Sequence, residues 1–262
     1  MMPDPMELVL VEPADDSLCA VVLAAGEGAR LRPLTLRRPK PLCPVDNVPL
    51  VDHARYRAAT ATPHVAVNLH HGRDALAEHL GDTGVHLSVE DGPEALGTAG
   101  ALGLLRPWID GRGTVVLNAD SWSPGSLAGA VAGWDRERVR LLVVGDDRFS
   151  PTSRLAGALL PWSEVALLAP EPTGLYEVSW GRLLAEGRID ALRWDGPWAD
   201  CGTPGRYLAA NLMASGGASV VGTGSRVDGT VERSVLWEDS EVRPGEMLVD
   251  AIRSGDLTVL VR

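Results

Sequence analysis

The stretch that decides the fold of this chain is LAAGEGARLRPLT at residues 23–35, followed by PKPL at residues 39–42. It directly follows the apolar run Cys19–Leu23, which has the length and β-branching of a buried strand. The small residues of positions 24–28 leave backbone amides bare, and glycine lets a ligand approach the backbone closely. The stretch therefore predicts a loop that binds an anion at the end of the first strand.

The charge of this stretch supports the same prediction. No acidic residue lies between Gly28 and Val45, although the chain carries a net charge of -11. Lys40 is the only lysine of the sequence, and its proline neighbours fix φ and hold the ammonium group on a stiff loop. The five cations of this stretch are Arg30, Arg32, Arg37, Arg38 and Lys40. Such a local reversal of sign favours an anionic ligand over a proline-rich surface loop that only solvates its arginines.

Composition limits the class of protein. The 262 residues, 45% of them hydrophobic, can bury a full core, so we expect one large α/β domain with a small appendage. The pI near 5.0 argues against nucleic acid as a partner. No apolar run of membrane-spanning length is present, and the acidic start does not look like a signal peptide. Three cysteines without Cys-x-x-Cys spacing favour a reducing, cytoplasmic location without disulfides or zinc.

Strand and helix patterns alternate along the chain, which predicts a mostly parallel sheet with its ligand beyond the carboxyl ends of the strands. Strands are expected at 64–69, 85–89, 114–118 and 139–144, and helices at 49–59, 73–80 and 126–134. Short strands are expected at 155–160, 165–168 and 173–177.

Three further positions carry candidate chemistry at the same sheet edge. Gly97 would let the backbone lie against a flat base or ribose, and the Thr98 hydroxyl would cap the helix that follows, although ordinary capping of a buried helix is the simpler alternative. Asp120 leaves a buried strand at this edge, where one or two carboxylates suffice for Mg²⁺, although aspartate also caps helices after strands.

Taken together, these motifs resemble the signatures of the sugar-phosphate nucleotidyltransferases, or NDP-sugar pyrophosphorylases. Residues 26–35 and 39–42 match the pattern Gly-x-Gly-x-Arg-Leu-Arg-Pro-Leu-Thr followed by Pro-Lys-Pro-Leu. Residues 96–101 match Leu-Gly-Thr-Ala-Gly-Ala, and residues 198–203 match Trp-x-Asp-x-Gly-Thr. The overall likeness is to mannose-1-phosphate guanylyltransferases and related bacterial hexose-1-phosphate nucleotidyltransferases.

The resemblance implies a Rossmann-like, three-layer α/β/α nucleotidyltransferase fold with a mostly parallel sheet. It also implies transfer of a nucleoside monophosphate from a nucleoside triphosphate to a sugar 1-phosphate, with Mg²⁺ as cofactor. GTP with mannose 1-phosphate is the first expectation. UTP or dTTP with glucose 1-phosphate or an amino-sugar phosphate, a non-sugar phosphate acceptor, or a non-catalytic nucleotide-sugar sensor are the alternatives.

The resemblance also assigns roles to particular residues. Arg30, Lys40 and Asp120 would be catalytic, and Asp120 and Asp200 would hold the metal. The expected sugar-binding residues are Gly174 and Glu177. The expected nucleotide-binding residues are Leu23, Ala24, Ala25, Gly26, Gly28, Arg30, Lys40, Asn68, Glu94, Leu96, Gly97 and Thr98.

The chain departs from the family pattern on the acceptor side. Many relatives carry a Glu-Lys-Pro segment whose lysine binds the sugar phosphate, and this sequence has no lysine there. Arg182, Arg188 or Arg193 could replace it, or the loop and the metal alone could hold the phosphate.

The C-terminal region has its own pattern. Valines and a leucine at positions 221, 227, 235, 242 and 248 form an imperfect hexapeptide repeat, which resembles a left-handed β-helix of about two turns. So short a stack should pack on the main domain or on a second subunit in a homo-oligomer. The expected organisation is an extension at 1–18, the nucleotidyltransferase domain at 19–214 and the repeat segment at 218–262.

Overall fold

The computed structural model describes residues 16–261, so most of the expected extension at 1–18 lies outside the described residues. A seven-stranded sheet forms the centre, with the strand order β10-β8-β9-β6-β1-β4-β5. All neighbouring strands are parallel except β9, which runs antiparallel to β6 and β8. The strands are β1 (Leu18–Leu23), β4 (Val65–Leu69), β5 (His86–Val89), β6 (Gly113–Asn118), β8 (Val139–Val144), β9 (Leu155–Leu160) and β10 (Ile189–Trp194).

Helices cover both faces of this sheet and give it three layers. Along β1, Ala20 and Val22 face one core while Cys19 and Val21 face the other, because successive strand side chains point to opposite faces. The first core packs against α1 (Leu50–Ala59), α2 (Arg73–Leu80) and α4 (Ala128–Val131), and the second against α3 (Gly97–Ile109), α5 (Trp162–Val165) and α6 (Gly181–Ala185). The expected three-layer α/β/α fold with a mostly parallel sheet is confirmed.

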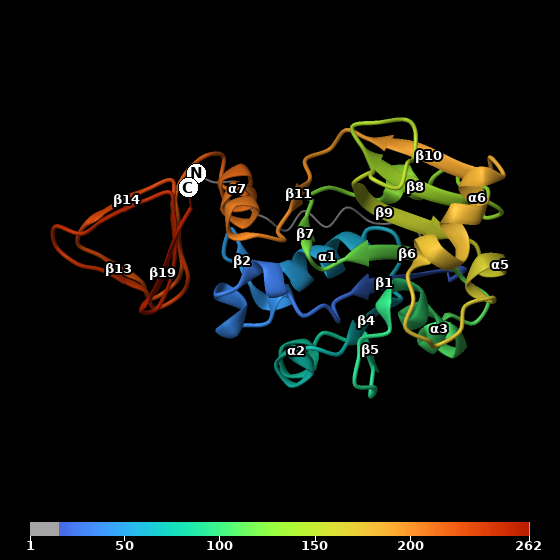
Figure 1. Cartoon of the computed structure of the whole chain (residues 1–262), viewed down its shortest axis with the longest axis horizontal. Coiled ribbons are helices and arrows are strands. Elements are labelled where there is room, and N and C mark those ends of the chain that lie inside the picture. The colour runs from blue at the N-terminus through green and yellow to red at the C-terminus, as the bar shows by residue number, and fades with distance from the viewer. Residues whose placement is uncertain (1–15, 262) are drawn as a thin grey trace.

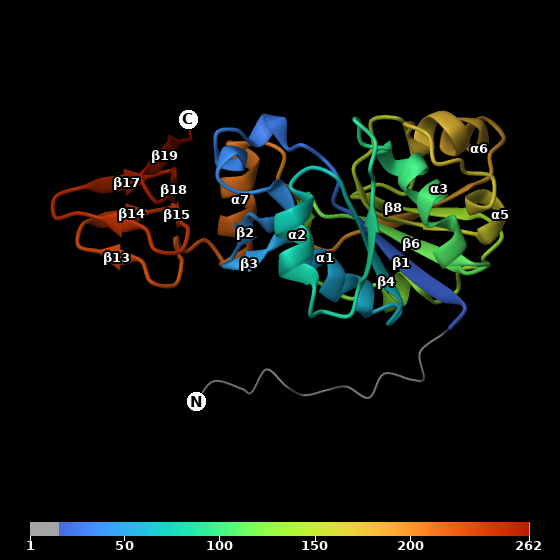
Figure 2. The same cartoon turned by 90° about the horizontal axis from the view of Figure 1, so that it is seen from below.

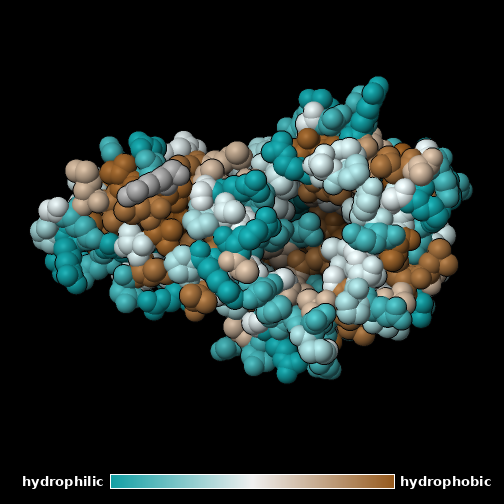
Figure 3. All heavy atoms as spheres, in the orientation of Figure 1, coloured by the Kyte–Doolittle hydropathy of each residue, from teal (hydrophilic) through white to brown (hydrophobic). Residues whose placement is uncertain are grey.

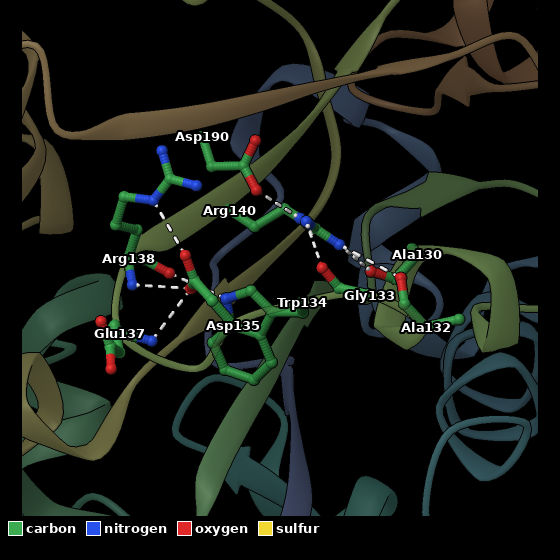
Figure 4. Close-up of polar contacts among 9 residues, drawn as sticks. All are labelled: Ala130, Ala132, Gly133, Trp134, Asp135, Glu137, Arg138, Arg140 and Asp190. Carbon is green, nitrogen blue, oxygen red and sulfur yellow. Dashed lines mark hydrogen bonds and ion pairs between the residues drawn. The ribbon is translucent and has the colours of Figure 1, made fainter.

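The helix expected at 126–134 is shorter than the prediction. Helix α4 ends at Val131, and Gly133 takes a left-handed φ of 70°. The Arg140 guanidinium on β8 donates to the carbonyl oxygens of Ala130 and Gly133, both at 3.0 Å, and pairs with Asp190 on β10 at 2.6 Å (Figure 4). Arg140 on β8 thus donates to carbonyl oxygens that would accept from backbone amides if the helix continued for another turn.

Two predicted short strands are wrong. Residues 165–168 leave helix α5 and enter a turn, and residues 176–180 form the π-helix η4 (Tyr176–Trp180), which leads into α6. The buried positions explain the error, since Val165 and Leu168 lie three residues apart and Leu175, Ser179 and Leu183 lie four apart. This is a helical spacing, whereas a strand would bury alternate residues. Strand β10 was not expected, because Asp190 and Arg193 interrupt its apolar pattern.

The loop after β1 is built from short 3-10 turns and leads into a hairpin. The turns are η1 (Ala29–Leu31), η2 (Leu34–Leu36) and η3 (Lys40–Leu42), and the hairpin consists of β2 (Pro44–Val45) and β3 (Val48–Pro49). Further along the chain, β7 (Ser121–Trp122) pairs antiparallel with β11 (Ala199–Asp200), which leads into α7 (Pro204–Ala214). Thr203 caps α7 by accepting a hydrogen bond from the Arg206 amide, and Pro204 occupies its first turn.

The C-terminal region forms parallel coils with a triangular outline in Figure 1 and a stacked side view in Figure 2. The first coil comprises β12 (Val220–Val221), β13 (Arg226–Val227) and β14 (Thr230–Glu232), and the second comprises β15 (Val235–Leu236), β16 (Glu241–Val242) and β17 (Met247–Val249). Each strand pairs in parallel with its counterpart, and β18 (Ala251–Ser254) begins a third layer with the antiparallel partner β19 (Leu257–Leu260).

Of the five repeat positions, the last three are buried and the first two, Val221 and Val227, are exposed. Both exposed valines lie in the end coil, which has a neighbouring coil on one side only.

The coils pack on the main domain through one shared apolar cluster. Trp237 of the second coil is buried against Tyr207 of α7, and its indole N–H donates to the Tyr207 hydroxyl at 2.9 Å. The Arg38 guanidinium lies 5.0 Å from the Trp237 ring centroid, a cation–π contact. Association of these coils with a second subunit stays a prediction. Within residues 16–261, no helix combines the length and apolar character needed to cross a bilayer.

Candidate functional site

The loop after β1 lines a cavity at the carboxyl ends of the central strands. The Ala24 amide donates to the Asn68 side-chain oxygen at 2.7 Å, which fixes the start of the loop against β4. At Gly28, where φ is 68°, an added Cβ would lie 2.8 Å from Lys40 Cβ, so only glycine fits. At Gly26 an added Cβ would meet nothing within 4 Å, so this backbone faces open space. A ligand can therefore reach the amides directly.

A cavity of about 420 Å³ opens above this loop. The face seen in Figure 3 is hollowed near the ends of β1 and β6. The cavity is lined by Leu23, Ala24, Ala25, Gly26, Gly28, Ala29, Arg30, Lys40, Pro41, Asn68, Ala95, Gly97, Thr98, Asn118, Ala119, Asp120 and Gly202. Most of the expected nucleotide-binding residues thus share one cavity, whereas Glu94 and Leu96 are not among its lining residues.

Lys40 and Asp120 meet in this cavity. The Lys40 ammonium lies 3.0 Å from Asp120 Oδ2, and the two side chains are 7% and 49% exposed. Gly72 allows Pro39 to pack closely, because an added Cβ there would lie 2.3 Å from Pro39 Cγ. The buried lysine stem and the open carboxylate together place a fixed cation beside an anion that solvent and ligands can reach.

Asp200 lies close to Asp120 through the pairing of β7 and β11, although it is not among the residues that line the cavity. Its Cα lies opposite Ser121, and the Cys201 amide donates to the Asp120 backbone oxygen at 3.1 Å. The Gly202 amide donates to Asp200 Oδ1 at 2.6 Å, and Arg206 pairs with Oδ2. An added Cβ at Gly202 would lie 2.8 Å from Asp200 Oδ1 and 3.2 Å from Arg30 Nη2. Arg30 and Asp200 are therefore close neighbours at the rim.

Cys201 lies buried beneath these charges. Burial raises the pKa of its thiol to about 12, while Lys40 acts to lower that pKa and both aspartates act to raise it. All three groups are therefore near this thiol, which stays protonated at neutral pH.

The Asp120 carboxylate fits the needs of Mg²⁺, which takes one or two protein carboxylates and otherwise binds water and phosphate oxygens, whereas both oxygens of Asp200 already have partners in Gly202 and Arg206. Among the described residues, Asp120 Oδ1 has no hydrogen-bond partner, and no cluster of three or more acidic, histidine or cysteine side chains is present. A metal here would depend on the phosphates of a ligand for its remaining bonds.

A buried carboxylate that the sequence analysis did not single out connects the anion loop to the loop before α3. Glu90, 2% exposed, accepts from Asn68 Nδ2 through one oxygen and from the Leu96 amide through the other, both at 2.7 Å. The Asn68 oxygen in turn accepts from the Ala24 amide. Glu90 follows β5 just as His70 follows β4, and these strands pair in parallel, so their shared sheet edge was the available signal.

Thr98 does not cap α3, contrary to expectation. Its hydroxyl accepts from the Leu175 amide at 2.8 Å, and the Ala99 amide donates to the Thr173 oxygen at 3.1 Å. The Thr173 oxygen therefore accepts from an amide in the first turn of α3, the kind of group that a capping side chain would otherwise accept from. Gly97 has a φ of 70°, and an added Cβ would lie 2.6 Å from the Thr173 oxygen. These contacts hold the loop before α3 against the segment before η4.

A second cavity of about 200 Å³ shares Leu23, Thr98 and Asn118 with the first. Gly174 and Glu177, the expected sugar-binding residues, line it from the start of η4 rather than from a strand. The strand glycine that lines this cavity is Gly157 on β9. The remaining lining residues are Val116, Leu155, Ala158, Leu175, Tyr176 and Trp180.

The arginines considered as substitutes for the missing lysine pair elsewhere. Arg182 pairs with Glu164 and Glu186, Arg188 also pairs with Glu186, and Arg193 pairs with Asp195. None of the three lines either cavity.

Three of the five cations after β1 are directed away from the cavity as well. Arg32 pairs with Glu27, while Arg37 and Arg38 pair with Asp256 and Glu238 of the C-terminal coils. Part of the positive charge of this stretch therefore fastens the coils to the main domain, through Arg37 and Arg38. Arg30 and Lys40 remain at the cavity.

Comparisons with known proteins agree with this geometry. A family model described as nucleotidyl transferase matches residues 19–148. An N-acetylmuramate alpha-1-phosphate uridylyltransferase of Caulobacter vibrioides is 34% identical over 233 residues, which cover 73% of this chain and 94% of that protein. A protein of Oryza sativa subsp. japonica named probable mannose-1-phosphate guanylyltransferase 3 is 25% identical over 291 residues, covering 92% and 81%.

One solved structure is similar in fold. It is a Bacillus anthracis protein provisionally named glucose-1-phosphate thymidylyltransferase, in complex with sucrose. The TM-score is 0.63 at 22% sequence identity, and the match covers 75% of this chain and 95% of that one. At this identity the likeness describes the fold.

Proposed function

The chain belongs to the nucleotidyl transferase family, and we propose that it transfers a nucleoside monophosphate from a nucleoside triphosphate to a sugar 1-phosphate and releases pyrophosphate. One observation carries the proposal. A single cavity brings together bare loop amides, the cations Arg30 and Lys40 and the accessible carboxylate of Asp120. A second cavity, which shares three lining residues with the first, offers a separate place for the acceptor.

In the proposed reaction, a phosphate oxygen of the sugar 1-phosphate attacks the α-phosphorus of the triphosphate. A new P–O bond forms to the acceptor, and the bond between the α-phosphorus and the pyrophosphate oxygen breaks, so the electron pair leaves with pyrophosphate. Both reactants are anions, and the main task of the protein is to bring them together and to stabilise the oxygens that gain charge. The reaction needs no covalent intermediate with the protein.

The residues divide this task between them. The amides of residues 26–30 and the Arg30 guanidinium would hold the β- and γ-phosphates, because bare amides and a planar cation both donate to phosphate oxygens. Lys40 would neutralise the transferred phosphate from its fixed position beside Asp120. Asp120 and Asp200 would hold Mg²⁺, which when bound supplies positive charge to the reacting oxygens. Asn68 and Glu90 would keep the two loops aligned.

The candidate substrates follow from the relatives. GTP with mannose 1-phosphate is the first candidate, supported by the match to the rice protein along most of this chain. UTP or dTTP with glucose 1-phosphate or an amino-sugar phosphate is the alternative. The Caulobacter vibrioides N-acetylmuramate alpha-1-phosphate uridylyltransferase, which has the higher identity, supports UTP with an amino-sugar phosphate. A non-sugar phosphate as acceptor, or a nucleotide-sugar sensor without turnover, would use the same fold.

A pyrophosphate-release assay tests the proposal. The purified chain with Mg²⁺ is offered each of GTP, UTP, dTTP, ATP and CTP with a set of sugar 1-phosphates and, in parallel, with phosphocholine. We expect release that requires both a triphosphate and a sugar 1-phosphate and that yields a nucleotide-sugar in equal amount. Release with phosphocholine alone would contradict the sugar acceptor, and nucleotide-sugar binding without any release would contradict the catalytic role.

A further inference from the structure

Arg57 on α1 is a buried cation that the proposed reaction does not use. It is 7% exposed, and burial lowers the pKa of its guanidinium to about 10, so the group stays charged at neutral pH. Its Nη1 donates to the Ala156 backbone oxygen on β9 at 2.6 Å, and its guanidinium carbon lies 4.6 Å from the Trp194 ring centroid. Within residues 16–261, Nε and Nη2 are buried without any hydrogen-bond partner.

Other arginines with buried stems have a counter-charge. Arg55, two residues earlier on the same helix, pairs with Asp52 at 2.6 Å, and Arg140 pairs with Asp190 at the same distance. Among the described residues, Arg57 has only a carbonyl oxygen and an aromatic face, and neither carries a net charge. A buried charge is costly unless it is paired, so this cation requires a negative partner that those residues do not supply.

A small cavity of about 10 Å³ lies at this guanidinium, among α1, β6, β7 and β9. Such a volume holds one group of about the size of a water molecule, so it excludes phosphate, sulfate and nucleotides. None of the described residues that line it is acidic. Its polar lining residues are His53, Arg57, Asn118, Ser121 and Ser123.

Donors predominate in this lining. Arg57 has two unpartnered nitrogens and no acceptor, and the Asn118 side chain can donate through its amide nitrogen. The Ser121 hydroxyl lies 3.5 Å from the Asn118 backbone oxygen, a long contact that leaves its proton free to turn toward a ligand. The Ser123 hydroxyl and His53 Nε2 already donate to backbone carbonyl oxygens, at 2.8 and 2.9 Å. A water molecule would fill the volume but leave the buried charge unpaired, whereas an anion accepts from the donors and neutralises the charge.

From these observations we infer that the cavity binds a single-atom anion, chloride, in contact with Nε and Nη2 of Arg57. This site is separate from the nucleotide cavity, although Asn118 lines both. Ser121 follows Asp120 and lies opposite Asp200 in the pairing of β7 with β11. A bound chloride therefore connects α1 to the strand beside the two aspartates.

Anomalous diffraction tests the identity of the occupant. Crystals of the wild-type chain grown in sodium chloride are measured at a long X-ray wavelength, where chlorine scatters anomalously and the oxygen of water does not. We expect one anomalous peak in this cavity, in contact with the Arg57 guanidinium. Density in the cavity without an anomalous signal would identify a water molecule and overturn the inference.

Thermal unfolding tests the same site in solution. The Tm is measured in sodium chloride and in sodium gluconate of equal ionic strength, because gluconate is too large for the cavity. We expect the Tm to be about 3–5 °C higher in chloride once its concentration exceeds the Kd ten-fold. Equal Tm values in the two salts over the full range of concentrations would contradict chloride binding.

Two variants assign this difference to one side chain. Arg57→Met removes the charge and should abolish the difference in Tm between the two salts. Arg55→Met is the matched control on the same helix, and it should keep the difference because Arg55 already pairs with Asp52. A difference that persists in Arg57→Met would refute the assignment. If Arg57→Met does not fold, the anomalous peak and the wild-type Tm values still decide the question. None of these measurements requires turnover, so their outcome is independent of the proposed function.

Discussion

Replacing Lys40 by methionine removes one charge from the site and little else. The Lys40 side chain is 7% exposed, so its aliphatic stem is packed, and methionine fills a similar volume. The lost ion pair with Asp120 involves a carboxylate that is 49% exposed and remains solvated. A half-exposed pair contributes at most about 1 kcal/mol to the free energy of unfolding. For a chain of this size, that corresponds to a fall in Tm of no more than about 4 °C.

The effect on turnover should be far larger. Loss of one group that stabilises charge in the transition state typically costs about 2.7–4 kcal/mol, or two to three powers of ten in kcat. Without Lys40, Asp120 would also repel the incoming phosphates. Rapid-quench measurement of nucleotide-sugar formation from labelled triphosphate gives the rate, and thermal unfolding gives the stability.

Arg37→Met is the control for this experiment. Arg37 lies in the same loop but pairs with Asp256 of the C-terminal coils, so we expect its kcat to stay within about two-fold of the wild-type value. A folded Lys40→Met protein that retains a tenth or more of the wild-type kcat would refute the role given to this cation.

Three further predictions concern stability and reactivity. Asn68→Ala should lower the free energy of unfolding by about 2–5 kcal/mol, because the buried Ala24 amide and a Glu90 oxygen both lose a hydrogen-bond partner. Urea denaturation measures this change, and an unchanged midpoint would contradict the network. Trp237→Ala should cost about 3–5 kcal/mol through the cavity left between the coils and α7, and limited proteolysis should then release the coils; resistance equal to wild type would contradict the packing. Burial raises the pKa values of the Cys43 and Cys201 thiols to about 12, so iodoacetamide at pH 8 should label them only after unfolding; mass spectrometry that finds them labelled in the folded protein would contradict their burial.

Much of the fold could be predicted because its signals are local. The run before Gly26 has the composition of a buried strand, and helix α2 begins and ends at the predicted residues, 73 and 80. The carboxyl ends of parallel strands share one edge of the sheet. Because Asn68 and Asp120 were predicted at such strand ends, they were also predicted to lie close together, and they line the same cavity. The roles of these residues in catalysis stay predictions.

The errors arise where a residue's partner lies far along the chain. The pairing of Arg37 and Arg38 with Asp256 and Glu238 could not be predicted, because these partners lie about two hundred residues later in the chain. The Thr98 hydroxyl was expected to cap its own helix, yet it accepts from Leu175. Residues 173–177 were expected to form a strand. The residues buried in this region, Leu175, Ser179 and Leu183, recur every four positions, which is the spacing of a helix. Local patterns could not show which groups these residues meet.

The central claim is that Asp120 and Asp200 hold one divalent ion against the phosphates of a nucleotide seated on residues 26–30. Crystals grown with Mn²⁺ and a non-hydrolysable nucleoside triphosphate test this directly, because the anomalous scattering of manganese locates the metal. We expect one peak in contact with both carboxylates and with the α-phosphate, and a triphosphate on the loop amides. A peak away from either aspartate, or a nucleotide bound outside the 420 Å³ cavity, would contradict it.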